Sequence, residues 1–213
     1  MHDAWADAAT EVAKRSRTQT RRRLIEATPR VFVERGIGGA SVAQICSAAG
    51  FTRGAFYSNF ESKEELAAAI YVDHVDGLVE LLSHRVVEQL ESGMAIGTIL
   101  REVFDAIAGV SNGSDWHLFR LEMHLASRRS EQMRRVVEDQ YERLLGAAEE
   151  ALGHAQAHGV RLQLPVDVLA RLFVAVRDGE EMRMKAPVGD SLLHPVWDAF
   201  TIIPSDDQRM PRA

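Results

Sequence analysis

Residues 41–66 constrain the fold more than any other part of the chain, because two helix starts and a glycine turn follow one another there. Ser41 precedes an apolar run and is followed three residues later by Gln44, which is the pattern of a capping box. Gly50 favours the left-handed backbone on which many helices end. The sequence therefore predicts a helix over Val42–Ala49.

A second, shorter helix is predicted directly after this turn. Thr52 is suited to cap its N-terminus, and the helix is expected over Arg53–Asn59. Ser62 and Glu65 repeat the capping-box spacing, so a long third helix is expected to begin at Lys63. Two short helices joined by a glycine turn fit a helix-turn-helix, whose second helix enters the major groove of DNA.

The residue types around the second helix suit contact with DNA. An arginine can bind a guanine edge with two hydrogen bonds, and hydroxyl or amide groups can contact bases or phosphates. A lysine at a helix start adds its charge to N–H groups that already favour an anion. The alternative is an ordinary helical hairpin with solvated basic side chains. The candidate DNA-binding residues are Ser41, Thr52, Arg53, Gly54, Ala55, Tyr57, Ser58, Asn59 and Lys63.

The run GFTRGAFYSNFESKEEL at 50–66 resembles the signature of the TetR family of transcriptional regulators. The resemblance extends without a gap over residues 20–66, about a quarter of the chain. One departure is Pro29 in the presumed first helix, where a kink or local bulge is expected because proline lacks an N–H and crowds the preceding turn. By the resemblance, phosphates are held by Tyr57 and Lys63, and bases are faced by Thr52, Arg53 and Ala55.

Charge is distributed unevenly along the chain. The whole sequence of 213 residues carries a formal net charge of −6, but residues 14–60 hold nine basic and two acidic side chains, a net of +7. The remainder therefore carries −13. A basic segment joined to an acidic body concentrates the attraction for phosphate in one place, which favours DNA binding over a solvated hairpin.

The predicted architecture is all-α. It consists of a flexible basic N-terminal arm at 1–19, a helix-turn-helix DNA-binding domain at 20–62, a helical ligand-binding and dimerisation domain at 63–203, and a C-terminal tail at 204–213. The arm is expected to be disordered when free and to contact phosphate when bound, or to lie in the minor groove. The body has no alternating strand pattern. Its expected helices are Lys63–Leu90, Ala95–Ala108, Asp115–Ser127, one from Ser130, Pro165–Lys185 and Ser191–Phe200.

The helix expected over Pro165–Lys185 is apolar on nearly all sides in its first half. Such a helix must be buried on more than one face. We expect the core on one face and a second copy of the chain on the other; central burial within one subunit is the alternative. In proteins of the resembled family the last two long helices form the two-fold interface, which agrees with a homodimer.

An effector pocket is expected within the body. Apolar cavities with a few polar groups are the usual small-molecule sites, although aromatic and methionine side chains at helical spacing also form plain core. The candidate pocket residues are Phe104, Trp116, Phe119, Met123, His124, Tyr141 and Phe173.

Other classes of function fit less well. The chain contains no nucleophile-elbow or phosphate-loop motif, so it is not expected to be an enzyme or to need a cofactor. His154 and His158 lack the glutamate of a zinc-protease helix and are expected near a helix end. The single cysteine, Cys46, indicates a reducing compartment and a buried thiol. No apolar run is long enough for a membrane span, so a cytoplasmic protein is expected.

The sequence thus predicts a homodimeric, ligand-responsive regulator, most simply a repressor that binds a palindromic operator in double-stranded DNA and is released by a small molecule. The alternative is a helical small-molecule-binding protein whose helix-turn-helix has lost useful DNA affinity.

Overall fold

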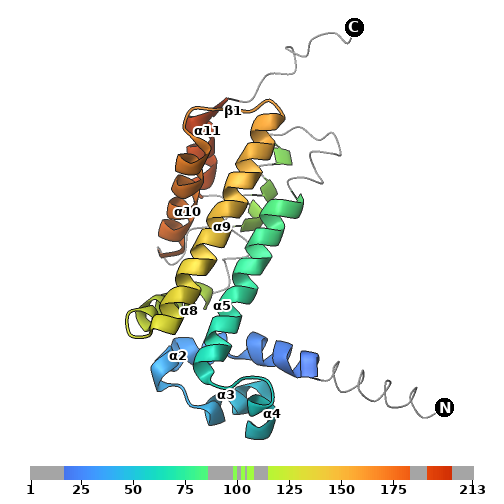
Figure 1. The fold of residues 1–213 in the computed structure, drawn as a ribbon, viewed down its shortest axis with the longest axis vertical. Coiled ribbons are helices and arrows are strands. Elements are labelled where there is room, and N and C mark those ends of the chain that lie inside the picture. Colours follow the sequence, from blue (N-terminus) through green and yellow to red (C-terminus); the bar gives the residue numbers. More distant parts are fainter. Residues whose placement is uncertain are drawn as a thin grey trace, which may run out of the picture. The chain divides into compact units, whose positions relative to one another are not determined.

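The computed structural model describes residues 17–85, 98–99, 102–103, 105–107, 115–182 and 191–202 (Figure 1). Within these ranges the fold is all-α apart from one pair of very short strands, which confirms the predicted class. Phe104, most of the N-terminal arm, the C-terminal tail and much of the helix expected at Ala95–Ala108 lie outside the described residues.

Pro29 interrupts the first helical segment, as its chemistry requires. Residues 17–27 are helical, Thr28 is a bend, and α2 begins at the proline and spans Pro29–Gly39. Proline is well placed in the first turn of a helix because the N–H it lacks would have no partner there. The Thr28 hydroxyl donates to the Leu24 carbonyl oxygen at 2.6 Å, so this oxygen has a hydrogen-bond partner where the helix is interrupted. The expected kink is confirmed, and it divides the segment into two helices.

The remaining helices follow the predicted order. The long helix predicted to run to Leu90 is α-helical to Glu80 and π-helical over Leu81–Arg85, where its predicted form was wrong. Residues 86–90 lie outside the described residues. Apolar side chains at helical spacing do not distinguish an α-helix from one π turn. No helix in the described residues is both long and apolar enough to span a bilayer. The elements are α3 Val42–Ala49, α4 Arg53–Tyr57, α5 Lys63–Glu80, η1 Leu81–Arg85, α8 Trp116–Ser127, α9 Glu131–Ala157, α10 Val166–Met182 and α11 Leu193–Phe200.

The expectation that the body contains no strand was wrong. β1, Arg161–Leu162, pairs antiparallel with β2, Thr201–Ile202. The Gln163 N–H extends the pairing by donating to the Phe200 carbonyl oxygen at 2.9 Å. Two-residue strands are too short to show an alternating pattern, so their pairing is a tertiary event that the local sequence does not reveal.

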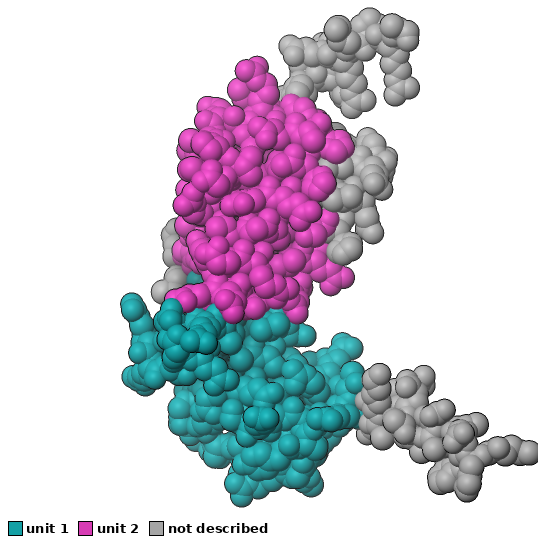
Figure 2. Space-filling view, in the orientation of Figure 1, with its two compact units in different colours: residues 1–73, 118–137 teal, residues 74–117, 138–213 magenta. Residues whose placement is uncertain are grey.

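The chain forms two compact units, coloured separately in Figure 2. Unit 1 comprises residues up to Asp73 together with Leu118–Val137, and unit 2 comprises His74–His117 together with residues from Glu138 onward. Unit 1 therefore joins the helix-turn-helix to the start of α5, most of α8 and the start of α9. The fully buried side chains of its core come from all of these segments: Leu24, Phe32, Ile45, Phe56, Phe60, Leu66, Phe119, Met123 and Met133.

Gly36 gives α2 a break near its C-terminal end. Its backbone angles, φ 72° and ψ 153°, lie in a region that only glycine adopts without strain. The break leaves the Ile37 N–H to donate to the Glu122 carboxylate of α8 at 3.2 Å. A β-carbon on Gly36 would lie 3.1 Å from the same carboxylate oxygen. The backbone conformation therefore requires glycine at this position, and a β-carbon would also force the Glu122 carboxylate to shift by a few tenths of an ångström.

We predict that Gly36→Ala lowers the free energy of unfolding by about 1–3 kcal/mol, the usual cost of forcing a side chain into this backbone region. Gly39→Ala is the matched control, because a β-carbon there meets no atom within 4 Å. The control should be neutral or slightly stabilising, since alanine is preferred to glycine in helices. Urea unfolding followed by helical circular dichroism measures both, and an equal loss in the two variants would contradict the assigned role of Gly36.

Candidate nucleic-acid interface

The first helix of the helix-turn-helix begins and ends as predicted. The Ser41 hydroxyl accepts from the Gln44 N–H at 3.3 Å, and the Gln44 side-chain oxygen accepts from the Ser41 N–H at 2.9 Å. These two hydrogen bonds complete the capping box. Gly50 ends α3 in the left-handed region, with φ 72° and ψ 32°, and its N–H donates to the Cys46 carbonyl.

The second helix, α4, is two residues shorter than predicted. The Thr52 hydroxyl caps it by accepting from the Ala55 N–H at 3.2 Å. At the other end the Ser58 hydroxyl and the Asn59 amide both donate to the Ala55 carbonyl oxygen, at 2.9 and 2.8 Å. Short polar side chains that bind nearby backbone acceptors compete with helix continuation, which explains why α4 ends at Tyr57.

Burial divides α4 into an anchoring side and an outer side. Phe56 is fully buried and contacts Phe60, with 6.0 Å between ring centroids. Thr52, Arg53 and Gly54 are exposed, and Tyr57 is 55% exposed. The single buried ring fixes the orientation of a helix too short to be stable alone. The side that faces solvent then carries a guanidinium and a phenol with no bulky neighbour between them.

Lys63 lies where α5 begins, and it also secures the end of α2. Its ammonium donates to the carbonyl oxygens of Gly38 at 2.6 Å and Ala40 at 2.8 Å. An ammonium has three N–H donors, so one remains for a phosphate.

The second capping box, at the start of α5, is only half formed. The Ser62 hydroxyl accepts from the Glu65 N–H at 3.0 Å, as predicted. The Glu65 carboxylate, however, accepts from the Glu61 N–H at 2.6 Å, one residue earlier than predicted.

Two arginines that were not among the candidate DNA-binding residues lie against aromatic rings of unit 1. The Arg21 guanidinium is 4.4 Å from the centroid of the Phe60 ring, and that of Arg23 is 5.3 Å from the Phe51 ring. Both side chains stay exposed. The cation–π contacts hold positive charge beside α3 and α4. The run of three arginines at 21–23 was visible in the sequence, but the aromatic partners lie 28 or more residues away and gave no local signal.

Cys46 lies inside the helix-turn-helix and is a free, buried thiol, as predicted. Its sulfur lies 3.5 Å from the Thr52 carbonyl oxygen. Burial raises the pKa of the Cys46 thiol, and the positive charge of Arg53 opposes that rise. The protonated thiol is therefore the favoured form in the folded protein.

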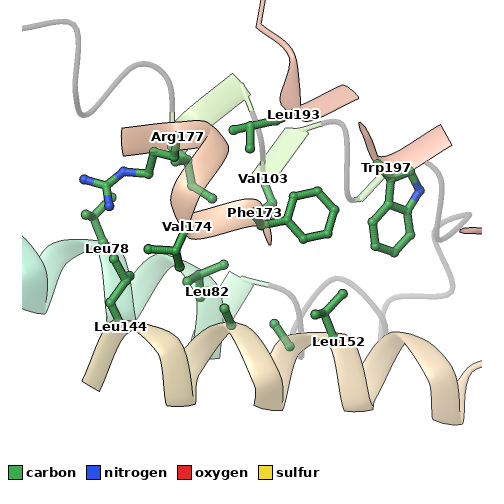
Figure 3. A pocket seen from close by; sticks show the side chains of 13 residues that line it. Leu78, Leu82, Val103, Leu144, Leu152, Phe173, Val174, Arg177, Leu193 and Trp197 are labelled. Carbon is green, nitrogen blue, oxygen red and sulfur yellow. The ribbon is translucent and has the colours of Figure 1, made fainter. Parts of the chain in front are cut away.

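Unit 2 contains an apolar cavity, shown in Figure 3. About 660 Å³ of space that is free of protein atoms, part of it open to solvent, lies between α5, α9, α10, α11 and the described residues at 103–107. The lining residues are Leu78, Leu82, Val103, Ile107, Leu144, Ala148, Ala151, Leu152, Phe173, Val174, Arg177, Leu193 and Trp197.

Of the candidate pocket residues, Phe173 lines this cavity, where its ring stacks on Trp197 at 5.9 Å. Phe119 and Met123 are fully buried in unit 1, and the Phe119 ring stacks on Phe32 at 6.0 Å. These two side chains join α8 to α2. Methionine and aromatic spacing along α8 could not distinguish such a packing role from a ligand-binding one.

The other candidates do not line the cavity either. Trp116 is buried in unit 2 with its ring 3.4 Å from that of His74. His124 is exposed and Tyr141 is 39% exposed. The residues that do line the cavity are mostly leucine, valine and alanine. The same residue types fill any helical core, so the sequence alone could not identify them as lining a cavity.

Among the described residues, no group of three or more histidine, cysteine or acidic side chains is arranged to hold a metal ion. His154 and His158 lie at the C-terminal end of α9, as predicted, and the His158 ring is 2.8 Å from the His154 carbonyl oxygen. Histidines in that position interact favourably with the negative end of a helix.

A capped helix-turn-helix on a helical body defines the class of DNA-binding transcriptional regulators. Residues 24–70 match the profile described as bacterial regulatory proteins, tetR family. The transcriptional repressor DhaR of Mycobacterium sp. (strain GP1) is 28% identical over 171 residues, which cover 80% of this chain and 84% of DhaR. The helix-turn-helix segment of this chain, residues 24–70, is therefore of the type found in the tetR family of bacterial regulatory proteins.

Solved structures share the fold over most of the chain. A TetR-family regulator from Mesorhizobium loti superposes with a TM-score of 0.70 at 14% identity, covering 87% of this chain and 98% of that one. SmeT, named as the repressor of a Stenotrophomonas maltophilia efflux pump, superposes in its triclosan complex with a TM-score of 0.68 at 21% identity. That match covers 91% of this chain and all of SmeT. The relatives named here are regulators of transcription and not enzymes.

We predict that iodoacetamide alkylates Cys46 roughly tenfold or more slowly in the native protein than in urea, because the thiol is buried and each unit of raised pKa removes tenfold of the reactive thiolate. Arg53→Gln should slow the native reaction further, since the charge that lowers the pKa is gone. Mass spectrometry of timed samples gives the rates. Native alkylation as fast as in urea would show that the thiol is accessible and would contradict this account.

Proposed function

We propose that this chain is a homodimeric transcriptional repressor of the cytoplasm that binds a palindromic operator and is released by a small molecule. The observation that carries the proposal is the outer side of α4, where Arg53 and Tyr57 face solvent above the buried Phe56. A guanidinium there can bind a guanine edge, and the phenol can donate to a phosphate. Lys63 has one N–H available for a second phosphate.

The proposal of a homodimer rests on the surface of α10 and α11. Val168 on α10 is 41% exposed and Leu192, which directly precedes α11, is 46% exposed, while the opposite side of α10 is buried by Leu169 and Phe173. In the proposed dimer a second copy of the chain covers both side chains and removes their apolar surface from water. A two-fold dimer would place two α4 helices in successive major grooves, which requires an operator with two-fold symmetry.

The proposal of release by a ligand rests on the cavity of unit 2 and on the packing of α8. The triclosan complex of SmeT shows that a protein of this fold holds a small molecule. In this chain α8 contacts α2 through the Phe119–Phe32 stack and the hydrogen bond from the Ile37 N–H to Glu122. The cavity wall includes Leu78 of α5, and Lys63 at the start of the same helix is hydrogen-bonded to the end of α2. A ligand that shifts α5 would therefore move α2 and, with it, the spacing of the two α4 helices. DNA affinity would fall by population shift.

The test is selection of DNA by the purified protein, followed by titration of the selected sequence at several salt concentrations. A palindromic site bound in the nanomolar range, with affinity that falls steeply with salt, is expected for a dimer that neutralises several phosphates. Weak binding of all sequences, unchanged after unfolding and refolding to remove a copurified ligand, would refute the proposal.

We predict that Arg53→Ala relaxes base preference, with a loss of about 1–3 kcal/mol on the selected site and less on random DNA. Tyr57→Phe should weaken binding to all sequences by about 1 kcal/mol, because only a phosphate contact is lost. Arg161→Ala in unit 2 removes the same charge as Arg53→Ala at an exposed site and should leave the preference unchanged. Fluorescence anisotropy with specific and random duplexes measures these effects. If wild type and both α4 variants bind the selected DNA with equal affinity, α4 does not recognise the operator.

We further predict that Val168→Glu converts the protein to a monomer, because a charge would be buried without a partner in the proposed interface. Leu125→Glu on α8 is the matched control: Leu125 is 54% exposed but lies outside α10 and α11. Sedimentation velocity should show a monomer for the first variant and a dimer for the second. A dimer in both would place the interface elsewhere.

A further inference from the structure

Three arginines follow one another at 21–23 in the helical segment 17–27, and all three side chains are exposed. The middle one, Arg22, is bound to the Glu26 carboxylate of the same segment at 2.7 Å, so its charge is balanced locally. Arg21 and Arg23 differ from it. Within the residues that the structure describes, neither of their guanidinium groups has a hydrogen bond or an ion pair. Two of the three neighbouring charges therefore have no carboxylate bound to them.

Aromatic rings hold these two guanidinium groups without neutralising them. The guanidinium carbon of Arg21 lies 4.4 Å from the centroid of the Phe60 ring, and that of Arg23 lies 5.3 Å from the centroid of the Phe51 ring. Both distances are within the range of about 6 Å over which a ring attracts a cation. A phenyl ring has no charge and no oxygen acceptor, so the positive charge and the N–H donors of each guanidinium remain available to an anion.

Both rings belong to residues next to α4. Phe51 directly precedes Thr52, which caps α4, and Phe60 follows the last residue of the helix, Tyr57, by three positions. The Phe60 ring also contacts Phe56, the buried anchor of α4, with 6.0 Å between centroids. The two arginines are thus held by the residues that flank the proposed recognition helix. A helix in the major groove lies between the two phosphate backbones, and contacts to phosphates fix its register on the duplex.

We propose that Arg21 and Arg23 form a pair of phosphate-binding sites beside α4, each guanidinium held by its ring and each binding one phosphate of the operator backbone. The inference rests on the proposed function, because it requires that α4 bind DNA, and it extends the DNA-contact surface to the segment 17–27. Ordering a long side chain on binding costs free energy, so a guanidinium already held by a ring binds a phosphate at a smaller entropic cost than a free one. Arginine and phosphate also match in geometry, since two parallel N–H donors can bind two phosphate oxygens.

The first experiment is fluorescence anisotropy of the full chain with the selected operator over a series of salt concentrations. Each phosphate contact contributes about 0.9 to the slope of log affinity against log salt concentration. Arg21→Gln and Arg23→Gln should each lower this slope by about 0.9 for every subunit bound. Each should also weaken binding about tenfold, on selected and random duplexes alike, because a charge-assisted contact is lost. Arg22→Gln is the matched control: it removes the same charge from the residue between them and should leave the slope unchanged.

Phe51→Leu tests the role of a ring. It keeps an apolar side chain and the charge of Arg23, but it removes the cation–π contact. The salt slope should stay as in wild type, while affinity falls roughly twofold to fivefold because the guanidinium is no longer held. Unchanged affinity would show that the ring does not position the arginine for DNA.

Wild-type slope and affinity in both Arg21→Gln and Arg23→Gln overturn the proposal. A lower affinity with an unchanged slope overturns it too, since the arginines would then act only in packing. Failure of wild type to bind any duplex would instead refute the proposed function of the whole chain. These three results are distinguishable because the same wild-type titration precedes every variant.

The second experiment needs no variant. Phenylglyoxal modifies exposed arginines, and tandem mass spectrometry gives the rate at each of the three positions with and without operator. The operator should slow modification of Arg21 and Arg23 and leave that of Arg22 unchanged. Unchanged rates at the outer two positions, or equal protection of all three, overturn the assignment even if a variant does not fold.

Discussion

The C-terminal end of α2 is the point on which the geometry of unit 1 depends. Within a few residues it has a glycine-only break at Gly36, an N–H that donates to Glu122 of α8, and two carbonyls that accept from Lys63 of α5. Helix ends leave unpaired backbone donors and acceptors, and here other helices supply the partners. The same groups that complete α2 therefore fix the positions of α5 and α8 against it.

If Lys63 also binds a phosphate, as proposed, its ammonium would have two functions. In the protein without DNA, two of its three donors stabilise the end of α2. A phosphate bound by the third donor would leave the two hydrogen bonds to α2 in place. Removal of Lys63 would loosen the helix-turn-helix as well as remove a phosphate contact. Substitutions of Tyr57 and Arg53 therefore separate DNA recognition from stability more cleanly.

Local chemistry explains which parts of the fold could be predicted from the sequence. The caps at Ser41 and Thr52 and the turn at Gly50 involve partners within five residues, so their patterns are visible in the chain itself. The cation–π contacts of Arg21 and Arg23, the pairing of β1 with β2 and the break at Gly36 depend on residues that are distant in sequence. The cavity could not be predicted for a further reason: a leucine that lines it has the same spacing and polarity as a leucine in solid core.

Release of DNA by a ligand requires that the ligand bind one state of the protein more tightly than the other. A ligand shifts an equilibrium only by the difference between its affinities for the two states, about 1.4 kcal/mol for each tenfold. The cavity of unit 2 has an apolar wall, so the difference in affinity would come from how closely that wall fits the ligand in each state. A ligand that releases the DNA would therefore have to fit the cavity of one state better than the cavity of the other.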